Sequence, residues 1–271
     1  MKTHACAFAA ALLAAAFLGA ACAASRPATP SAPAERELTL LTWNLLHGVD
    51  EAGKANLEAK ADWIRAQSPD VVFLQEQDRG VRRTQGVDQV ALLAQRTGLR
   101  GAFGAFMDYQ GGEYGLGMLT ALSAGEARPL RLPDGDEPRV ALLWEVDVLG
   151  ERLLCVDVHF NWIADDVARF AQARALLAHL ATIELACVVA GDFNDRPESR
   201  TLQAFLSAGF RHADPAGATW NARAPSKDID HVLVRSGRGL GLEPLGGEIL
   251  DGEQLSDHRA VRVRVRATRR D

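Results

Sequence analysis

One unbroken apolar run, residues 185–190, stops abruptly at Gly191-Asp192-Phe193-Asn194-Asp195. A short apolar run without alternation predicts a strand that is buried on both faces. Its carboxyl end would deliver polar groups to a cleft. Asp192 and Asn194 lie two residues apart, so on an extended chain both point to the same side and both can reach one phosphate or one metal-bound water. A strand followed by an ordinary Asx turn gives the same pattern, so other motifs must decide between these interpretations.

Strand and helix patterns alternate along the rest of the chain. We expect strands at residues 38–44, 71–74, 103–107, 118–122, 140–149, 153–160, 229–234 and 260–266. Amphipathic helices are expected at residues 54–66, 87–97, 165–181 and 199–206. No Gly-rich dinucleotide or P-loop fingerprint joins a strand to a helix. With no internal repeat, residues 38–271 fit one large α/β domain.

The N-terminus predicts export. Residues 1–23 have a charged start and a short apolar core, which is typical of a secretory signal peptide and too short for a membrane-spanning helix. Small residues before Ala23 suit ordinary cleavage, whereas residues 18–22 resemble a bacterial lipobox that would lipidate Cys22, although Gly19 departs from that pattern. The protein is therefore expected to be periplasmic, secreted or anchored to a membrane through Cys22. Residues 24–37, rich in Pro and Ala, predict a linker.

Charge argues weakly against one substrate class. The formal net charge is -5, from 30 Lys+Arg against 35 Asp+Glu. Proteins whose function depends on non-specific DNA binding are usually basic, so the negative net charge disfavours a nucleic-acid substrate without excluding it. The alternating arginines of residues 260–266 share one strand face, which favours a solvated sheet surface over a phosphate site. Cys155 and Cys187 both lie in apolar strands, which favours two buried free thiols over a disulfide.

Several predicted strands end in polar residues that suit phosphate chemistry. A hard cation such as Mg2+ needs a few oxygen ligands, and the absence of paired-Cys or His-x-x-His spacing argues against zinc. Phosphoester hydrolysis needs charge neutralisation, a base for water and donors for the transition state. A His held by a buried Asp adds a positioned imidazolium. The residues in question are Asn44, Glu76, His159, Asp192, Asn194, Asp230, Asp257 and His258.

These motifs together carry a family resemblance. Thr42-Trp43-Asn44, Gln75-Glu76, Val158-His159, Gly191-Asp192-Phe193-Asn194-Asp195, Ile229-Asp230-His231 and Ser256-Asp257-His258 occur in the order seen in the endonuclease/exonuclease/phosphatase superfamily, which the chain resembles over residues 38–265. The resemblance implies a four-layered α/β sandwich, with two mixed β-sheets face to face and helices outside.

The resemblance also implies roles. Glu76 would be the principal metal ligand, with Asn44 and Asp257 completing or adjoining the site, and the metal would be Mg2+, with Mn2+ or Ca2+ as alternatives. Asp192 would orient or deprotonate the attacking water, and Asn194 would hold the scissile phosphate. His258, paired with Asp230, and His159 would contact phosphate oxygens. Arg139, before a core strand, would add a phosphate donor.

The function expected from these roles is an exported Mg2+-dependent phosphoesterase, more specifically a phosphodiesterase, acting as a monomer. Nucleic acid, phospholipid headgroups and small phosphate esters remain open as substrates. The alternative is a catalytically silent phosphate- or lipid-binding module on the same fold. Leu116, where many family members have a polar residue, favours that alternative, and the retained catalytic set argues against it.

Other candidates have plainer explanations. His47 is expected to be a turn residue, and His231 a packed or outward strand residue rather than a second catalytic imidazole. Trp162 and Trp220 are expected to pack in the core or rim, with substrate stacking or membrane contact as alternatives. His179, His212 and Asp214 are expected at the surface.

Overall fold

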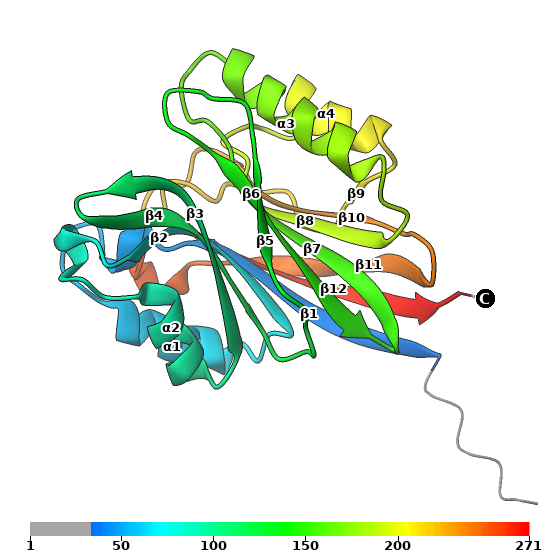
Figure 1. Cartoon of the computed structure of the whole chain (residues 1–271), viewed down its shortest axis with the longest axis horizontal. Helices are drawn as coiled ribbons and strands as arrows, with labels where there is room; N and C mark the ends of the chain where they lie inside the picture. Colours follow the sequence, from blue (N-terminus) through cyan, green and yellow to red (C-terminus); the bar gives the residue numbers. More distant parts are fainter. Residues whose placement is uncertain (1–33, 271) are drawn as a thin grey trace, which may run out of the picture. The chain divides into compact units, whose positions relative to one another are not determined.

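Two six-stranded β-sheets lie face to face, and helices cover the outer side of each (Figure 1). The computed structural model describes residues 34–270, which belong to one compact unit. The predicted signal peptide, the possible lipobox ending at Cys22 and most of the predicted linker lie outside these residues. None of the helices in the described part of the chain is long and apolar enough to cross a membrane.

The elements follow one another as β1 (Glu35–Asn44), η1 (Leu46–Gly48), α1 (Leu57–Ala66), β2 (Val71–Arg79), η2 (Arg82–Thr84), α2 (Gln89–Thr97), β3 (Arg100–Tyr109), β4 (Gly112–Thr120), β5 (Arg128–Arg131), β6 (Val140–Val148), β7 (Glu151–His159), α3 (Val167–Leu180), β8 (Ala186–Asp192), α4 (Arg200–Ser207), β9 (Arg211–His212), β10 (Asp230–Arg235), β11 (Leu240–Leu250), η3 (Gly252–Gln254) and β12 (Ala260–Arg269).

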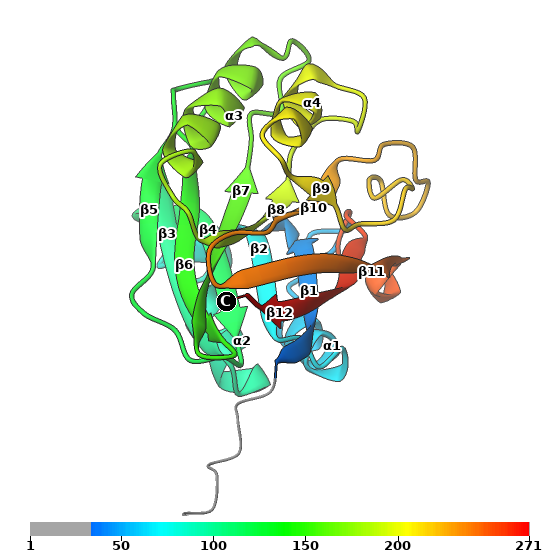
Figure 2. The same cartoon turned by 90° about the vertical axis from the view of Figure 1, so that its right-hand side faces the viewer.

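Both sheets are mixed. The first has the order β11-β12-β1-β2-β4-β3 and the second β5-β6-β7-β8-β10-β9. Each contains one parallel pair at its centre, β1 with β2 and β7 with β8, while the neighbouring pairs are antiparallel. Figure 2 shows α3 and α4 on the outer face of one sheet and α1 on that of the other. The predicted four-layered sandwich is confirmed.

Apolar side chains form three cores, which correspond to the three interfaces between four layers. The largest lies between the sheets and includes Phe73, Leu142 and Val188. A second packs α3 and α4 against the second sheet, and a third packs α1 and α2 against the first. The parallel strands are buried on both faces, which explains their continuous apolar sequences.

The topology brings the ends of several strands together at one end of the β-sandwich. Parallel strands β1 and β2 end there, and because β12 runs antiparallel to β1, its first residues lie there too. The second sheet repeats the arrangement, since β7 and β8 end where antiparallel β10 begins, with His159 opposite Asp192 and Asp192 opposite Asp230. Polar residues at these ends therefore come together without any long connection.

The edge strands differ most from expectation. Residues 240–250 form β11, which the sequence pattern missed because Pro244 and three glycines interrupt it. Pro is tolerated here because β11 is an edge strand with a register shift after Pro244. At the other limit, β1 begins at Glu35 rather than at residue 38, and its first residues pair with β12.

The arginines of β12 behave as a solvated sheet face. Arg262 forms an ion pair with Glu248 at 3.1 Å, and Arg266 with Glu243 at 2.9 Å. These partners are exposed carboxylates on neighbouring strands, so the cations are already paired. No phosphate-binding role is needed to explain the alternation.

Cys155 and Cys187 are free and buried, as expected. They lie on adjacent strands, but Cys155 packs between the sheets whereas Cys187 packs under α3 and α4. Side chains on opposite faces of one sheet cannot meet, so a disulfide is excluded by geometry.

The expectation that Asp214 lies at the surface is wrong. Its side chain is 4% exposed and accepts hydrogen bonds from His231 at 3.0 Å and from the Val232 N–H at 3.0 Å. His231 is fully buried, and its other ring nitrogen lies 2.9 Å from the Asp195 carbonyl oxygen. Both ring nitrogens of His231 therefore face acceptors, as suits an imidazolium. The sequence pattern does not show this pairing because it depends on the β9–β10 contact.

This pair predicts a pH-dependent stability. Burial lowers the pKa of His231, but the charge and hydrogen bond of Asp214 outweigh burial and raise the pKa to about 9 from an ordinary 6.5. A raised pKa stabilises the fold fully below pH 6.5, and the stabilisation is lost as the pH rises through 9. We expect Asp214→Asn to be less stable than wild type at pH 6, and this difference to narrow by about 3 kcal/mol by pH 10.

Urea unfolding at several pH values measures this difference. Asp166→Asn is the matched control, because Asp166 pairs with Arg200 at the surface and Arg does not titrate in this range. A difference for Asp214→Asn that stays constant from pH 6 to pH 10 would show that His231 is not held as an imidazolium.

A buried carboxyl group joins the two sheets. Asp157 of β7 is fully buried and accepts hydrogen bonds from Gln75 Nε2 at 2.6 Å and from the Leu74 N–H at 3.2 Å. Burial raises the pKa of Asp157 well above its ordinary value. Both donors belong to β2, so Asp157 connects the central strands of the two sheets behind the edge where the strands end.

Asp157→Ala leaves both donors buried with a lost partner. We expect it to lower the free energy of unfolding by about 2–4 kcal/mol. Asp108→Ala, at an exposed position of β3, should change it by less than about 0.5 kcal/mol. Denaturant unfolding of both variants tests the difference, and equal small effects would contradict a structural role for Asp157.

Candidate active site

A cavity of about 440 Å³ opens at the end of the β-sandwich where β1, β2, β7 and β8 finish. It is lined by residues of both sheets and of five loops: Glu76, Tyr114, Glu137, Arg139, His159, Trp162, Asp192, Asn194, Trp220, Lys227, Ile229, Asp257 and His258. Of the predicted site residues, only Asn44 and Asp230 do not line it, and both are hydrogen-bonded to residues that do.

Glu76 reaches the cavity because β2 is irregular at this point. Its backbone has φ +59°, and the register of β2 against β4 shifts between Leu74 and Gln77. A bulge of this kind re-aims a side chain that a regular strand would turn elsewhere. Burial raises the pKa of Glu76, but the hydrogen bond from His47 and the other polar neighbours outweigh it and lower the pKa to about 2. Glu76 is therefore an ionised carboxylate at neutral pH.

The carboxylate of Asp192 lies close to polar side chains from both sheets. One carboxylate oxygen, Oδ2, lies 3.2 Å from Asn44 Nδ2, 3.5 Å from His159 Nε2 and 3.7 Å from His258 Nε2. The other oxygen accepts the Asn194 N–H at 2.8 Å. Burial and the neighbouring charge of Asp230 raise the pKa of Asp192 to about 7.

The turn after β8 depends on Gly191. Its φ is +141°, and a Cβ atom there would meet the Val158 carbonyl oxygen at 2.0 Å. No other residue fits so close to β7. Asn194 follows with φ +51°, and its Nδ2 donates to the Phe160 carbonyl oxygen at 3.1 Å. Both predicted catalytic residues of this turn therefore have fixed positions.

His258 is held between two carboxylates. Its Nδ1 lies 2.9 Å from Asp230 Oδ2, and its Nε2 faces Asp192. Burial lowers the pKa of His258, but Asp230 and Asp192 outweigh burial and raise the pKa to about 10. Asp192, Asp230 and His258 have ligand atoms within 4.8 Å of one another, so this buried cluster could hold an ion. Without an ion, an imidazole with a pKa near 10 is protonated on both nitrogens at neutral pH.

His159 differs from His258 in charge. Burial and the nearby Arg139 lower the pKa of His159 well below its ordinary value, so it is neutral. Arg139 is buried, with one nitrogen paired to Glu137 at 2.8 Å. Its Nε and Nη1 atoms, like His159 Nδ1, have no hydrogen-bond partner within residues 34–270. The cavity wall thus holds donors whose hydrogen bonds are unfulfilled.

The donor set fits a hard divalent cation. Glu76 is ionised, and Asp257 adds a second carboxylate to the same cavity. Oxygen ligands of this kind are preferred by Mg2+, Mn2+ and Ca2+. Asn44 Nδ2 donates to Glu76 at 3.1 Å as well as to Asp192, while its Oδ1 accepts the Leu46 N–H. In this arrangement Asn44 orients both carboxylates, and it would offer its oxygen to a cation only after the amide turns over.

Sequence reasoning missed Lys60, which is fully buried beneath the site. Its Nζ donates to the carbonyl oxygens of Leu45 at 2.5 Å and Val49 at 2.7 Å and so holds the loop that carries His47. Burial lowers the pKa of Lys60 to about 7, against the charges of Asp257 and Glu76. Its helical spacing from Leu57 and Ile64, both apolar, was the signal that could have placed it inward.

His47, expected to be only a turn residue, contacts the predicted metal ligand Glu76. Its Nδ1 is 3.4 Å from Glu76 Oε2. Trp220 lines the cavity, and its indole N–H donates to Asp257 at 3.1 Å. Leu116 is fully buried in the core between the sheets and does not line the cavity. The one feature that favoured a silent binding module therefore has a packing explanation.

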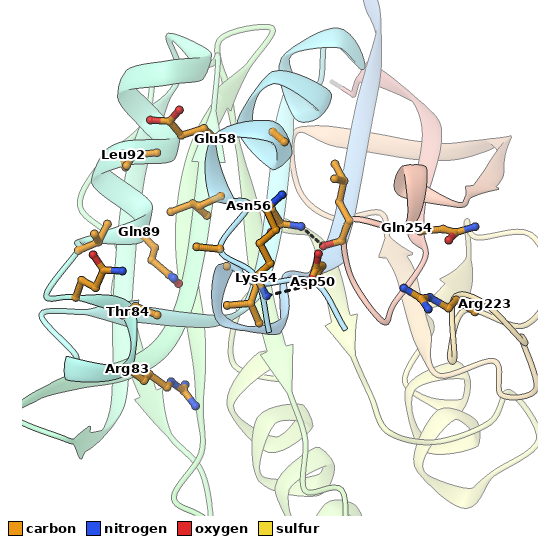
Figure 3. Close-up of a pocket in the computed structure, with 18 residues that line it drawn as sticks. Asp50, Lys54, Asn56, Glu58, Arg83, Thr84, Gln89, Leu92, Arg223 and Gln254 are labelled. Atoms are coloured by element: carbon orange, nitrogen blue, oxygen red, sulfur yellow. Dashed lines mark hydrogen bonds between the residues drawn. The ribbon is translucent and has the colours of Figure 1, made fainter. Parts of the chain in front are cut away.

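A second, larger hollow of about 860 Å³ lies between the loop after η1, the two helices of the first sheet and the segment before Asp257 (Figure 3). Arg83 and Arg223 stand on opposite sides of it, and each is already paired, with Asp78 and Glu51 respectively. It shares no lining residue with the catalytic cavity in the described part of the chain.

Solved structures with this fold are numerous. An endonuclease/exonuclease/phosphatase from Beutenbergia cavernae is 20% identical, with a TM-score of 0.71 over 86% of this chain and 72% of that one. The mannosyl-6-phosphatase Bt3783 of Bacteroides thetaiotaomicron is 16% identical, with a TM-score of 0.67 over 84% and 99%. TDP2 from C. elegans is 17% identical, with a TM-score of 0.64 over 86% and 75%. At these identities the likeness shows the fold alone.

No curated protein matches the sequence. The family comparison is decisive, because it matches residues 41–258, which run from the strand before Asn44 to His258 and span every predicted site residue. The chain belongs to the Endonuclease/Exonuclease/phosphatase family.

Proposed function

We propose that this protein is an exported, divalent-metal-dependent phosphodiesterase that hydrolyses its substrate by in-line attack of water. The convergence on Asp192 Oδ2 of Asn44, His159 and His258 is the observation that carries the proposal. A buried carboxylate with a pKa near 7 can accept a proton from water at neutral pH. Export rests on the N-terminal sequence pattern.

Two neighbouring groups suit the charge that develops on phosphate. His258 is an imidazolium oriented by Asp230, so it can donate to a non-bridging oxygen and stabilise negative charge. Arg139 adds a second fixed cation whose Nε and Nη1 lack partners within the described residues. Asn194 presents a polar side chain at the turn next to Asp192.

Glu76 and Asp257 would hold the cation, with Asn44 adjoining. A bound divalent cation would neutralise charge on the phosphate oxygens. Lys60 supports the arrangement from behind by fixing the loop at residues 45–49. Two relatives of the same fold are named as a mannosyl-6-phosphatase and as TDP2, which supports phosphoester hydrolysis as the reaction class.

Metal dependence and Glu76 are tested together with bis(p-nitrophenyl) phosphate. We expect Mg2+ to support its hydrolysis and EDTA to abolish it. Glu76→Gln keeps the shape of the side chain but removes its charge, so kcat should fall at least about 100-fold. Glu248→Gln, which alters an exposed carboxylate on β11, should stay within about twofold of wild type.

Unchanged turnover in Glu76→Gln, or activity that resists EDTA, would contradict the proposal.

Once metal-dependent activity is established, the natural substrate class is identified by comparing wild type with Asp192→Asn as the inactive reference. Mg2+-dependent nicking of supercoiled plasmid identifies a nuclease. Turnover of phosphatidylcholine headgroups or of p-nitrophenyl phosphate instead identifies a phospholipid phosphodiesterase or a phosphomonoesterase.

A further inference from the structure

Trp162 is an exposed indole at the mouth of the catalytic cavity. Its exposed fraction is 57%, and the only other exposed large hydrophobic residue within residues 34–270 is Val167, at 67%. Trp162 lines the cavity together with Asp192 and His159, whereas Val167 does not. Of the two places expected for this residue, core or rim, the structure shows the rim, and the exposure of the indole beside the cavity needs an explanation.

The loop that presents Trp162 is held on both sides. Arg169 Nη1 donates to the carbonyl oxygens of Asn161 at 2.9 Å and Ile163 at 3.0 Å, the residues directly before and after Trp162. Arg169 itself is 5% exposed, and its Nε donates to Asp195 at 3.0 Å. One buried guanidinium thus fixes the indole's backbone and joins it to the turn that carries Asp192.

Trp162 and Trp220 flank the catalytic turn. In the second sheet β8 lies between β7 and β10, and the two tryptophans belong to the loops after β7 and before β10. Trp220 is already engaged, since Lys227 Nζ lies 4.4 Å from its ring centre and its N–H donates to Asp257. Trp162 takes no part in the ring contacts formed nearby by Phe160, Phe193 and Phe205.

We propose that Trp162 is a stacking platform for a planar ring of the substrate, so that the enzyme selects phosphate esters that carry an aryl group or a nucleobase. The backbone on both sides of Trp162 is fixed, so stacking a ring on the indole orders only this one side chain, and its apolar face gains a partner. The inference rests on the proposed function, because the cavity beside Trp162 is where the phosphate would bind.

Membrane contact is the competing explanation for an exposed Trp. The same loop carries Asp165 and Asp166, the latter paired with Arg200. Carboxylates beside the indole disfavour approach to anionic headgroups. The position of Trp162 in the cavity wall favours contact with the substrate over contact with a surface.

AMP and ribose 5-phosphate test the platform, because they share ribose and phosphate and differ in the base. Binding is measured by calorimetry with Mg2+ in an Asp192→Asn background, which prevents turnover. We expect AMP to bind about tenfold more tightly than ribose 5-phosphate. Trp162→Ala should bring this ratio close to one, Trp162→Phe should keep it within about threefold, and Val167→Ala should leave it unchanged.

Two outcomes overturn the inference. One is a ratio near one before Trp162 is altered, and the other is a ratio that Trp162→Ala leaves intact. Pelleting with phosphatidylcholine vesicles that depends on Trp162, with the ratio intact, would assign the residue to membrane contact instead. Failure of the proposed function is distinguished by turnover of bis(p-nitrophenyl) phosphate, which Glu76→Gln must abolish and which does not depend on the AMP ratio.

Discussion

A buried negative charge at Asp192 is the constraint on which the site depends. An ion taken out of water is strongly destabilising unless donors and opposite charges surround it. Asn44 comes from the first sheet, His159 from β7 and His258 from the segment before β12, so the surroundings of this one carboxylate require both sheets. Burial still dominates, which is why the pKa of Asp192 stays near neutrality. The surrounding donors and cations offset only part of the cost of burying the Asp192 charge, so this carboxylate can act as a weak base near neutral pH.

The two histidines beside Asp192 differ in protonation state: His258 is a cation and His159 is neutral. His258 has Asp230 on one side and Asp192 on the other, so its proton is retained to high pH. Burial and the nearby charge of Arg139 lower the pKa of His159. Two imidazoles on one oxygen atom can therefore act differently, one as a cation and one as a neutral group. A carboxylate in direct contact keeps the proton on His258, whereas burial and a nearby cation keep His159 neutral.

The sequence predicted the helices, the central strands and the gathering of polar residues at the strand ends, because each depends on local pattern. A parallel strand buried on both faces is continuously apolar, and its polar terminal residues mark the edge. The edge strand β11 was not predictable, since Pro244 and its glycines are tolerated only where one side lacks a partner. Lys60 was missed and Asp214 was misplaced because their burial depends on partners distant in the chain. Charge state is likewise a property of the assembled neighbours.

Asp195 shows how the catalytic turn gains rigidity from residues that never contact the cavity. Its backbone carbonyl accepts from His231 on one side, and its carboxylate accepts from Arg169 on the other. Both donors are buried, so neither exchanges readily with water. Because Arg169 also holds the backbone around Trp162, the turn that carries Asp192 and the loop that faces the substrate share one support. A substitution at Arg169 would then disturb substrate contact and catalytic geometry together, whereas one at His231 would disturb the catalytic turn and the buried pair with Asp214 but leave the support around Trp162 in place.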